Sequence, residues 1–178
     1  MDGAANLVLV GPMGSGKSVL GKRLAASLGL RFADADEELE RQAGSRIDLI
    51  FETEGESGFR LREREVLERL LADGDQVIAT GGGAVLDPGN RERIGKHGFV
   101  VWLQAGVESQ LQRLAADLDR PLLRDVDRRA TLLRLTAERA PFYAEVADLA
   151  FDTDLHSERA AGDALLALVQ SRWHRATA

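Results

Sequence analysis

A glycine-rich segment near the start of the chain has the residue types and spacing of a phosphate-binding loop. Residues 11–18 read Gly-Pro-Met-Gly-Ser-Gly-Lys-Ser and match the pattern G-x-x-x-x-G-K-[ST] in full. Glycines let the backbone turn tightly, so that successive N–H groups point at one anion. Lys17 adds a positive charge, and the Ser18 hydroxyl can bind magnesium. A structural turn would explain the glycines but not the Lys-Ser pair. The pattern therefore predicts a nucleotide site.

An alternate pair of carboxylates, Asp34 and Asp36, closes the second strand-like run. Ligands collect at the carboxyl ends of parallel strands, so one carboxylate can lie near a metal ion while the other faces a substrate hydroxyl. Asp36 before Glu37 and Glu38 is also how an ordinary helix begins, with an N-cap and an acidic first turn. No acid follows the run Val77–Thr80, where a second metal partner is usual, and this absence favours Asp34 as that partner.

Two further groups suit a small anionic substrate. Gly81, Gly82 and Gly83 follow a strand-like run, where bare N–H groups leave room for a ligand. A flexible turn would explain one glycine, whereas three favour a site. Arg60 and Glu63 are three residues apart on an expected helix, so Glu63 can hold the guanidinium toward a bound carboxylate. A surface helix rich in ion pairs has the same pattern.

Two arginines later in the chain are candidates of a weaker kind. Arg120 precedes Pro121 in the irregular segment 117–128, which we expect to form a mobile loop. A movable arginine can neutralise charge on a transferring phosphoryl group and help to exclude water. Arg139 and Tyr143 are four residues apart on an expected helix. Each of these residues could equally belong to an ordinary surface.

The surrounding pattern predicts how these residues are positioned. Short apolar runs alternate with helical stretches, which favours a parallel sheet with helices on both faces. The expected strands are Leu7–Val10, Arg31–Asp34, Gln76–Thr80, Phe99–Leu103 and Leu149–Asp152. The expected helices are Lys17–Leu28, Asp36–Ala43, Gly58–Ala72, Val107–Ala116, Arg129–Val146 and Ser157–Trp173. No repeat or linker divides the chain, so residues 1–178 are expected to form a single domain.

Composition narrows the class of protein. The chain has 178 residues, no cysteine and a formal net charge of −6. Disulfides and thiolate metal sites are therefore excluded, and the acidic balance argues against nucleic-acid binding. The apolar run Leu7–Val10 is too short for a signal core or a membrane span. We expect a cytoplasmic protein without membrane or nucleic-acid partners.

Taken in order, the motifs resemble those of the shikimate kinase family. The resemblance covers nearly the whole chain and rests on Gly11–Ser18, Asp34-x-Asp36, Phe59-Arg60-x-x-Glu63, Gly81-Gly82-Gly83, Arg120-Pro121-Leu122-Leu123 and Arg139-x-x-x-Tyr143. It implies an α/β, three-layer P-loop NTPase fold similar to nucleoside-monophosphate kinases, with a five-stranded parallel sheet flanked by helices. It also implies a lid near 117–128, a helical substrate-binding region near 34–63, and a monomer.

The resemblance further implies a reaction and a donor site. The γ-phosphate of ATP would pass to the 3-hydroxyl of shikimate, on the route to chorismate and the aromatic amino acids. Mg²⁺ would be bound by Ser18 with support from Asp34. Where the family often has a basic residue after the last strand, this chain offers His156, and Arg113 is the other candidate for the adenine. The implied ATP-binding residues are Gly14, Ser15, Gly16, Lys17, Ser18, Val19, Arg113, Arg120 and His156.

On the acceptor side, the resemblance implies that Asp36 binds ring hydroxyls and accepts the proton. Lys17 and Arg120 would complete the catalytic group by neutralising charge on the phosphates. Two arginines suit a small carboxylate, because each guanidinium can make a two-point contact. Glu63 would support this site. The implied substrate-binding residues are Asp36, Arg60, Gly81, Gly82, Gly83 and Arg139.

Three alternatives remain open at this point. Another small-metabolite or nucleotide kinase on the same fold would share the phosphate loop and the lid but differ in its acceptor. A GTP-binding switch commonly has an N-K-x-D sequence, yet neither Asn6 nor Asn90 precedes a lysine. A binding protein that has lost its activity would lack some of the polar residues the chemistry needs, and all of them are present.

Overall fold

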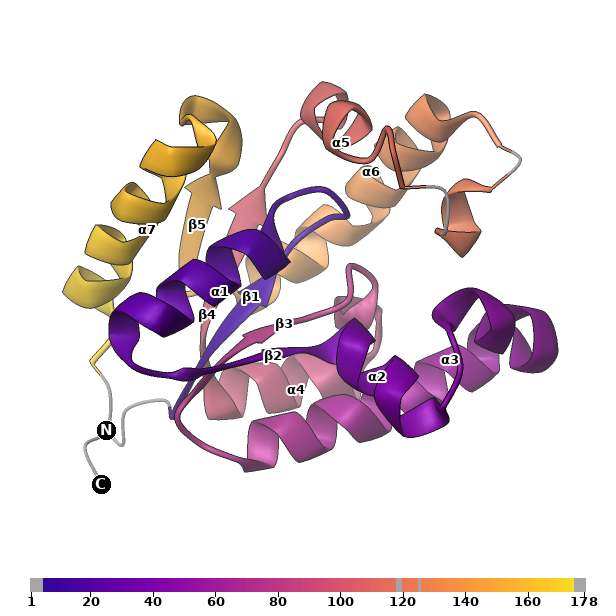
Figure 1. Ribbon diagram of the computed structural model, residues 1–178, viewed down its shortest axis with the longest axis horizontal. Coiled ribbons are helices and arrows are strands. Elements are labelled where there is room, and N and C mark those ends of the chain that lie inside the picture. Colours follow the sequence, from indigo (N-terminus) through magenta and orange to yellow (C-terminus); the bar gives the residue numbers. More distant parts are fainter. Residues whose placement is uncertain (1–4, 118–119, 125, 175–178) are drawn as a thin grey trace.

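A parallel sheet forms the centre of the molecule. The computed structural model describes residues 5–117, 120–124 and 126–174 (Figure 1). Its five strands have the order β2-β3-β1-β4-β5, and every neighbouring pair is parallel. The strands are β1 (Asn6–Val10), β2 (Arg31–Asp34), β3 (Gln76–Ala79), β4 (Gly98–Gln104) and β5 (Leu149–Asp152). Each end lies within one residue of the range expected from the sequence, and the predicted fold class is confirmed.

Helices cover both faces of this sheet. The described chain contains α1 (Lys17–Leu28), α2 (Ala35–Ala43), α3 (Ile47–Ala72), α4 (Pro88–His97), α5 (Val107–Arg113), α6 (Arg128–Val146) and α7 (Glu158–Arg172). Successive residues of β1 point to opposite faces. Leu7 and Leu9 pack in the cluster with α1 and α7, whereas Val8 and Val10 pack in the cluster with α2, α3, α4 and α6. All four are fully buried, which explains why this strand is apolar throughout.

Two helices differ from the sequence prediction. The helix expected at Gly58–Ala72 is longer and begins at Ile47, and its two parts meet at a break at Gly55, whose φ of 72° favours glycine. Helix α4 was not predicted, because it buries only Asn90 and Ile94 and so has almost no apolar period. The sequence signal available for this helix was its N-terminus. Asp87 is the N-cap and its side chain accepts a hydrogen bond from the Asn90 N–H, while the next residue, Pro88, begins the first turn.

Smaller differences concern the lid and its neighbours. Helix α5 ends at Arg113 and not at Ala116, and residues Pro121–Leu123 form a short 3-10 turn inside the expected loop. Leu123 in this turn packs with Leu114 and Leu132, which attaches the segment to α6. Residues 118, 119 and 125 of the predicted lid lie outside the described part of the chain.

The topology brings the candidate segments to one edge of the sheet. Leu9 pairs with Ala79, and Ala79 pairs with Asp34, so β1, β3 and β2 end side by side. The loop 11–18, the pair Asp34 and Asp36, and the glycines 81–83 follow directly from these ends. No helix in the described residues is long and apolar enough to cross a membrane.

Candidate active site

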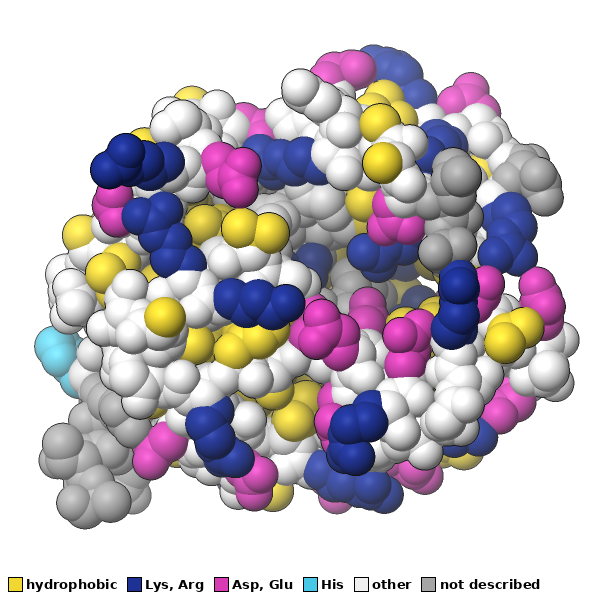
Figure 2. All heavy atoms as spheres, viewed as in Figure 1, with side chains coloured by type: hydrophobic (Ala, Val, Ile, Leu, Met, Phe, Trp, Pro, Cys, Tyr) yellow, Lys and Arg dark blue, Asp and Glu magenta, His cyan; other side chains and the backbone are white. Residues whose placement is uncertain are grey.

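A large cavity opens at the carboxyl ends of the strands. Its volume is about 720 Å³, within the range of small-molecule sites. Figure 2 shows the hollow to the right of centre, with basic and acidic side chains gathered around it. The predicted residues that line it are Gly14, Gly16, Lys17, Ser18, Val19, Asp34, Asp36, Arg60, Glu63, Gly81, Gly82, Gly83, Arg113, Arg120 and Arg139. Ser15 and His156 are not among its lining residues.

The phosphate-binding loop presents main-chain donors to this cavity. Gly16 has a φ of 90° and precedes α1, whose first turn has no side-chain cap. Its N–H groups and the positive end of the helix dipole therefore remain available to an anion. The Lys17 ammonium donates hydrogen bonds of 2.8 Å to the main-chain oxygens of Gly11 and Pro12. These two hydrogen bonds hold the Lys17 ammonium group against the phosphate-binding loop.

Burial changes the acidity of Lys17. It lowers the pKa of the ammonium from 10.5 to about 8, and the negative charge of Asp36 only partly opposes this shift. Bound phosphates would favour the charged lysine, because opposite charges raise the pKa of an ammonium. Nucleotide binding and protonation of Lys17 are therefore expected to be coupled.

This coupling predicts a pH dependence of ATP affinity. As pH rises through about 8, Lys17 loses its proton in the free protein, so ATP must bind together with one proton and its affinity falls. Calorimetric titrations above this pH, in buffers of different ionisation enthalpy, measure that proton uptake. The Lys17→Met variant should show none. Equal proton uptake by this variant and the wild type would assign the effect to another group.

Ser18 and Asp34 form a contact next to the loop. The Ser18 hydroxyl donates to Asp34 Oδ2 at 2.5 Å, while Asp34 Oδ1 accepts the N–H groups of Asp36 and Glu37 at 3.0 and 3.4 Å. Asp34 is therefore the N-cap of α2, and the reading of Asp36 as a possible cap is wrong. Because Asp34, the last residue of β2, supplies the cap, the Asp36 side chain remains available to the cavity.

Asp36 occupies a strongly charged environment. Burial raises the pKa of its carboxyl group, the neighbouring Asp34 adds to the shift, and Arg120 and Lys17 oppose it. Arg120 Nη1 lies 3.9 Å from Asp36 Oδ2, and its Nε donates to Asp117 Oδ2 at 2.9 Å. The structure thus brings together the acid, the lysine and the lid arginine that the sequence singled out separately.

Two arginines form the opposite part of the cavity. Arg60 Nη1 donates to Glu63 Oε2 at 2.8 Å, as its spacing predicts, and Glu63 is almost fully buried with a raised pKa caused by that burial. Arg139 is only 3% exposed and has no ion pair within the described residues. Its Nε has no hydrogen-bond partner there. A buried guanidinium without a carboxylate partner suits an anionic ligand.

The glycines 81–83 provide space for these groups. A Cβ on Gly83 would lie 2.5 Å from Arg60 Nη2, and one on Gly81 would lie 2.7 Å from Glu63 Oε1 and 2.9 Å from Asp36 Oδ1. None of the three has a positive φ. Their common property is therefore the absence of a side chain where charged groups converge.

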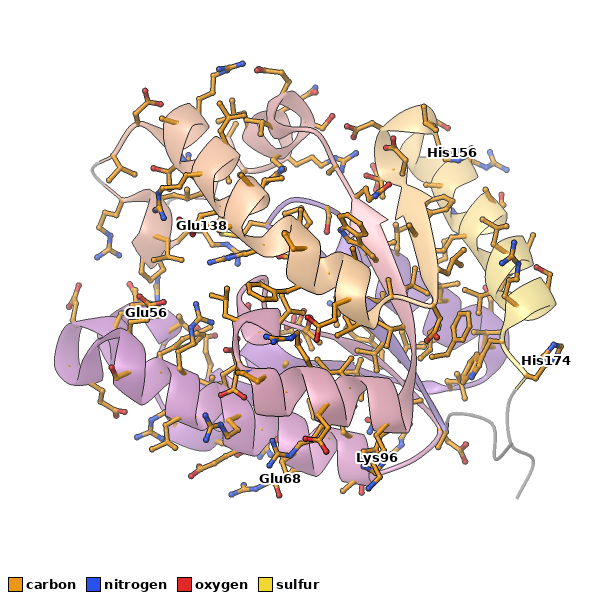
Figure 3. The ribbon with its side chains drawn as sticks, turned by 180° about the vertical axis from the view of Figure 1, so that it is seen from behind. Glu56, Glu68, Lys96, Glu138, His156 and His174 are labelled. Carbon is orange, nitrogen blue, oxygen red and sulfur yellow. The ribbon has the colours of Figure 1, made fainter. Side chains whose placement is uncertain are left out.

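The two candidates for the adenine end differ in position. Arg113 Nη1 donates to the main-chain oxygen of Gly14 at 2.9 Å and to Thr153 Oγ1 at 3.0 Å, which joins the phosphate loop to the end of β5. His156 stacks on Phe151, with ring centroids 5.0 Å apart. Figure 3 shows it near the end of β5, on the other side of the molecule from Glu56 on α3. An adenine contact by either residue stays a prediction.

The described part of the predicted lid is joined to α3 by ion pairs. Arg124 contacts Asp48 at 3.3 Å and Glu52 at 3.1 Å. In Figure 1 the orange segment that contains it lies above the first turns of α3. These contacts bridge the two sides of the cavity mouth.

Sequence reasoning gave no role to part of the cavity wall. Phe51 and Phe59 line it and lie with ring centroids 4.7 Å apart, and the Arg60 guanidinium lies over the Phe59 ring. These rings lie on opposite sides of the break at Gly55, so their proximity depends on a bend that the sequence pattern does not reveal. Gly55 and Gly58 were the available signal.

Comparisons with known proteins identify the family. A family model described as shikimate kinase matches residues 13–170. The chain is 48% identical to a shikimate kinase of Stenotrophomonas maltophilia over 98% of this chain and 97% of the relative. It is 50% identical to one of Xanthomonas axonopodis pv. citri over 97% of this chain and 96% of the relative. The chain belongs to the shikimate kinase family.

Solved structures agree with this membership. A shikimate kinase from Acinetobacter baumannii in complex with shikimate superposes with a TM-score of 0.91 at 44% identity, covering 94% of each chain. The Aquifex aeolicus shikimate kinase gives a TM-score of 0.78 at 32% identity, covering 93% of this chain and 97% of that one. As a member of the shikimate kinase family, the chain is an ATP-dependent kinase that acts on shikimate.

Proposed function

We propose that this cavity transfers the γ-phosphate of ATP to the 3-hydroxyl of shikimate, with the residues in the roles below. The observation that carries the proposal is the convergence of Asp36, Arg60 and Arg139 on one glycine segment beside the phosphate loop. Two guanidinium groups suit a single carboxylate, and a carboxylate base suits a hydroxyl acceptor.

The donor half would hold ATP and its metal. Main-chain groups of 14–19 would bind the phosphates, Lys17 would neutralise their charge, and Arg120 would approach from the lid. Ser18 and Asp34 supply two adjacent oxygen atoms, and the described residues contain no cluster of three acidic, histidine or cysteine side chains. Mg²⁺ fits such a site because it keeps most of its waters and phosphate ligands. When bound, it would neutralise phosphate charge.

The acceptor half would orient shikimate and remove its proton. Arg60, held by Glu63, and Arg139 would bind the carboxylate, and Gly82 would contribute a main-chain contact. Asp36 would accept a hydrogen bond from the reacting hydroxyl and then its proton. The positive charges of Arg120 and Lys17 oppose the rise that burial causes in the Asp36 pKa, and so favour the ionised form that a base requires.

A coupled assay of ADP release tests the acceptor. Shikimate should support turnover, whereas gluconate and nucleoside monophosphates should not. The Arg60→Lys variant should bind shikimate more weakly with little change in ATP affinity, because lysine cannot make a planar two-point contact. Turnover with a control acceptor but not with shikimate would overturn the proposal. Unchanged shikimate affinity in the variant would remove Arg60 from the carboxylate site.

Closure of the lid is expected to accompany binding. The pairs of Arg124 with Asp48 and Glu52 already connect the lid with α3, so bound ligands should stabilise this contact. Hydrogen exchange of residues 120–124 should slow when an ATP analogue and shikimate are both present. The Arg124→Gln variant should retain faster exchange under these conditions. Equal exchange of the wild type with and without ligands would argue against closure.

We also propose that the chain acts as a single-domain monomer in the cytoplasm, without nucleic-acid or membrane partners. The continuous sheet, the net charge of −6 and the lack of a membrane-crossing helix in the described residues support this. Sedimentation of the purified protein tests its oligomeric state.

A further inference from the structure

Tyr143 is a buried polar residue that the proposed roles leave without a function. Its side chain is 1% exposed and lies on α6, one turn after Arg139. The ring packs against Trp102 of β4, with centroids 5.8 Å apart. Its hydroxyl donates a hydrogen bond of 2.5 Å to the main-chain oxygen of Gly82. This contact joins α6 to the glycine segment that follows β3.

Gly82 lies where the donor and acceptor halves of the cavity meet. A Cβ at this position would lie 3.3 Å from Arg139 Nη1, 3.5 Å from Met13 N and 3.6 Å from Gly11 O. The Gly82 backbone therefore lies between the phosphate loop and the buried Arg139. A rotation of its peptide would change the spacing between the two halves.

We propose that Tyr143 is a positioning residue, whose hydroxyl fixes the Gly82 peptide and thereby the spacing between the phosphate loop and the acceptor pocket. The inference rests on the proposed function, because it takes this junction to be where ATP and shikimate meet. Reacting groups tolerate little displacement, and a shift of about 1 Å can lower a rate by about a hundredfold. Tyr143 acts through Gly82 and touches no reacting atom.

The phenol is suited to a constant structural contact. Burial raises the pKa of Tyr143 to about 12, although the positive charge of Arg139 and a hydrogen bond with the Arg139 side chain oppose the shift. The hydroxyl therefore keeps its proton, and remains a donor, throughout the pH range in which kinases are assayed. Its contribution to turnover should not vary with pH over that range.

The test compares two variants that each remove one hydrogen bond from a buried side chain to a main-chain oxygen. Tyr143→Phe keeps the ring and its packing on Trp102 but removes the hydroxyl. Gln76→Met is the matched control, because Gln76 is 3% exposed and donates to the Leu70 oxygen at 2.5 Å. Gln76 is the first residue of β3, whereas Gly82 follows the last residue of that strand. The control residue therefore lies at the opposite end of β3 from the cavity.

The expected result is a separation of the kinetic constants. In Tyr143→Phe, kcat for shikimate phosphorylation should fall by about tenfold, while the KM for ATP stays unchanged. This fall is smaller than the roughly hundredfold loss that a displacement of about 1 Å can cause, because the peptide loses one restraint and is not displaced outright. Gln76→Met should lose stability while both constants stay unchanged. In ligand-free Tyr143→Phe, amide hydrogens of residues 81–84 should exchange faster than in the wild type, a readout that does not depend on the substrate.

Several results would overturn the inference. Wild-type constants in Tyr143→Phe, or equal kcat losses in both variants, would show that the hydroxyl does not position the site. A Tyr143→Phe chain that fails to fold would make the hydroxyl structural, and unchanged exchange at 81–84 would show that it does not fix the peptide. A wild-type protein that does not phosphorylate shikimate would instead refute the proposed function, while the exchange result would still decide whether Tyr143 anchors Gly82.

Discussion

The Asp36→Asn variant should lose phosphoryl transfer while it still binds ATP. Asparagine keeps the size of the side chain but cannot accept the proton of the shikimate hydroxyl. Positioned acid–base groups contribute about 10²–10⁴-fold to rates, so kcat should fall by about that factor. ATP affinity should be retained, because the phosphate loop is unaffected and a negative charge near Lys17 is removed. Single-turnover kinetics and equilibrium ATP titration measure the two quantities.

The same variant should be more stable than the wild type at neutral pH. Burial raises the pKa of Asp36 in the folded protein, so its ionised form destabilises the fold above that pKa. The stability difference between variant and wild type should therefore shrink as pH falls through the raised pKa and the carboxyl group takes up its proton. Chemical denaturation at several pH values measures this difference.

Glu38→Gln provides the control for Asp36→Asn. Glu38 lies on the same helix and pairs with Arg41 at 2.6 Å, outside the cavity. Its loss should leave transfer unchanged. Near-normal turnover in Asp36→Asn would show that Asp36 is not the base, and a loss of ATP binding would show that it belongs to the donor half.

The sequence predicted the elements that have a clear pattern of apolar residues or a specific motif. All five strands were found, because four of them are short apolar runs flanked by turns and the fifth, Arg31–Asp34, precedes an acidic helix start. The phosphate loop was predicted with its following helix, because its glycines and its Lys-Ser pair have few other uses. The pairing of Arg60 with Glu63 followed from helical spacing alone.

Features that depend on tertiary contacts were beyond the pattern. The bend at Gly55 brings Phe51 and Phe59 together, and no local rule predicts its direction. The assignment of the α2 cap to Asp34 follows from where α2 begins, at Ala35 and not at the expected Asp36, a boundary that sequence reasoning places only within a few residues. The hydrogen bond from Tyr143 to Gly82 joins residues 61 positions apart, and no local sequence pattern predicts that they are in contact.

The Arg139→Met variant should separate binding from stability. Arg139 is 3% exposed, its Nε has no hydrogen-bond partner, and no carboxylate of the described residues forms an ion pair with it. Shikimate affinity should fall by about a hundredfold or more, because each hydrogen bond to a charged group contributes about 1.5–3 kcal/mol and two are lost. The ligand-free protein should be at least as stable, because an unpaired charge is costly to bury, whereas an apolar side chain is not.

Arg134→Met gives the matched control on the same helix. Arg134 is exposed and pairs with Glu138, labelled on α6 in Figure 3, at 2.9 Å. Its loss should leave shikimate affinity unchanged and alter the free energy of unfolding by no more than about 0.5 kcal/mol. Calorimetric titration with shikimate and chemical denaturation of the free protein measure both variants. If Arg139→Met instead lost stability and kept its shikimate affinity, the buried arginine would serve the fold, and the carboxylate would have to be bound by Arg60 alone.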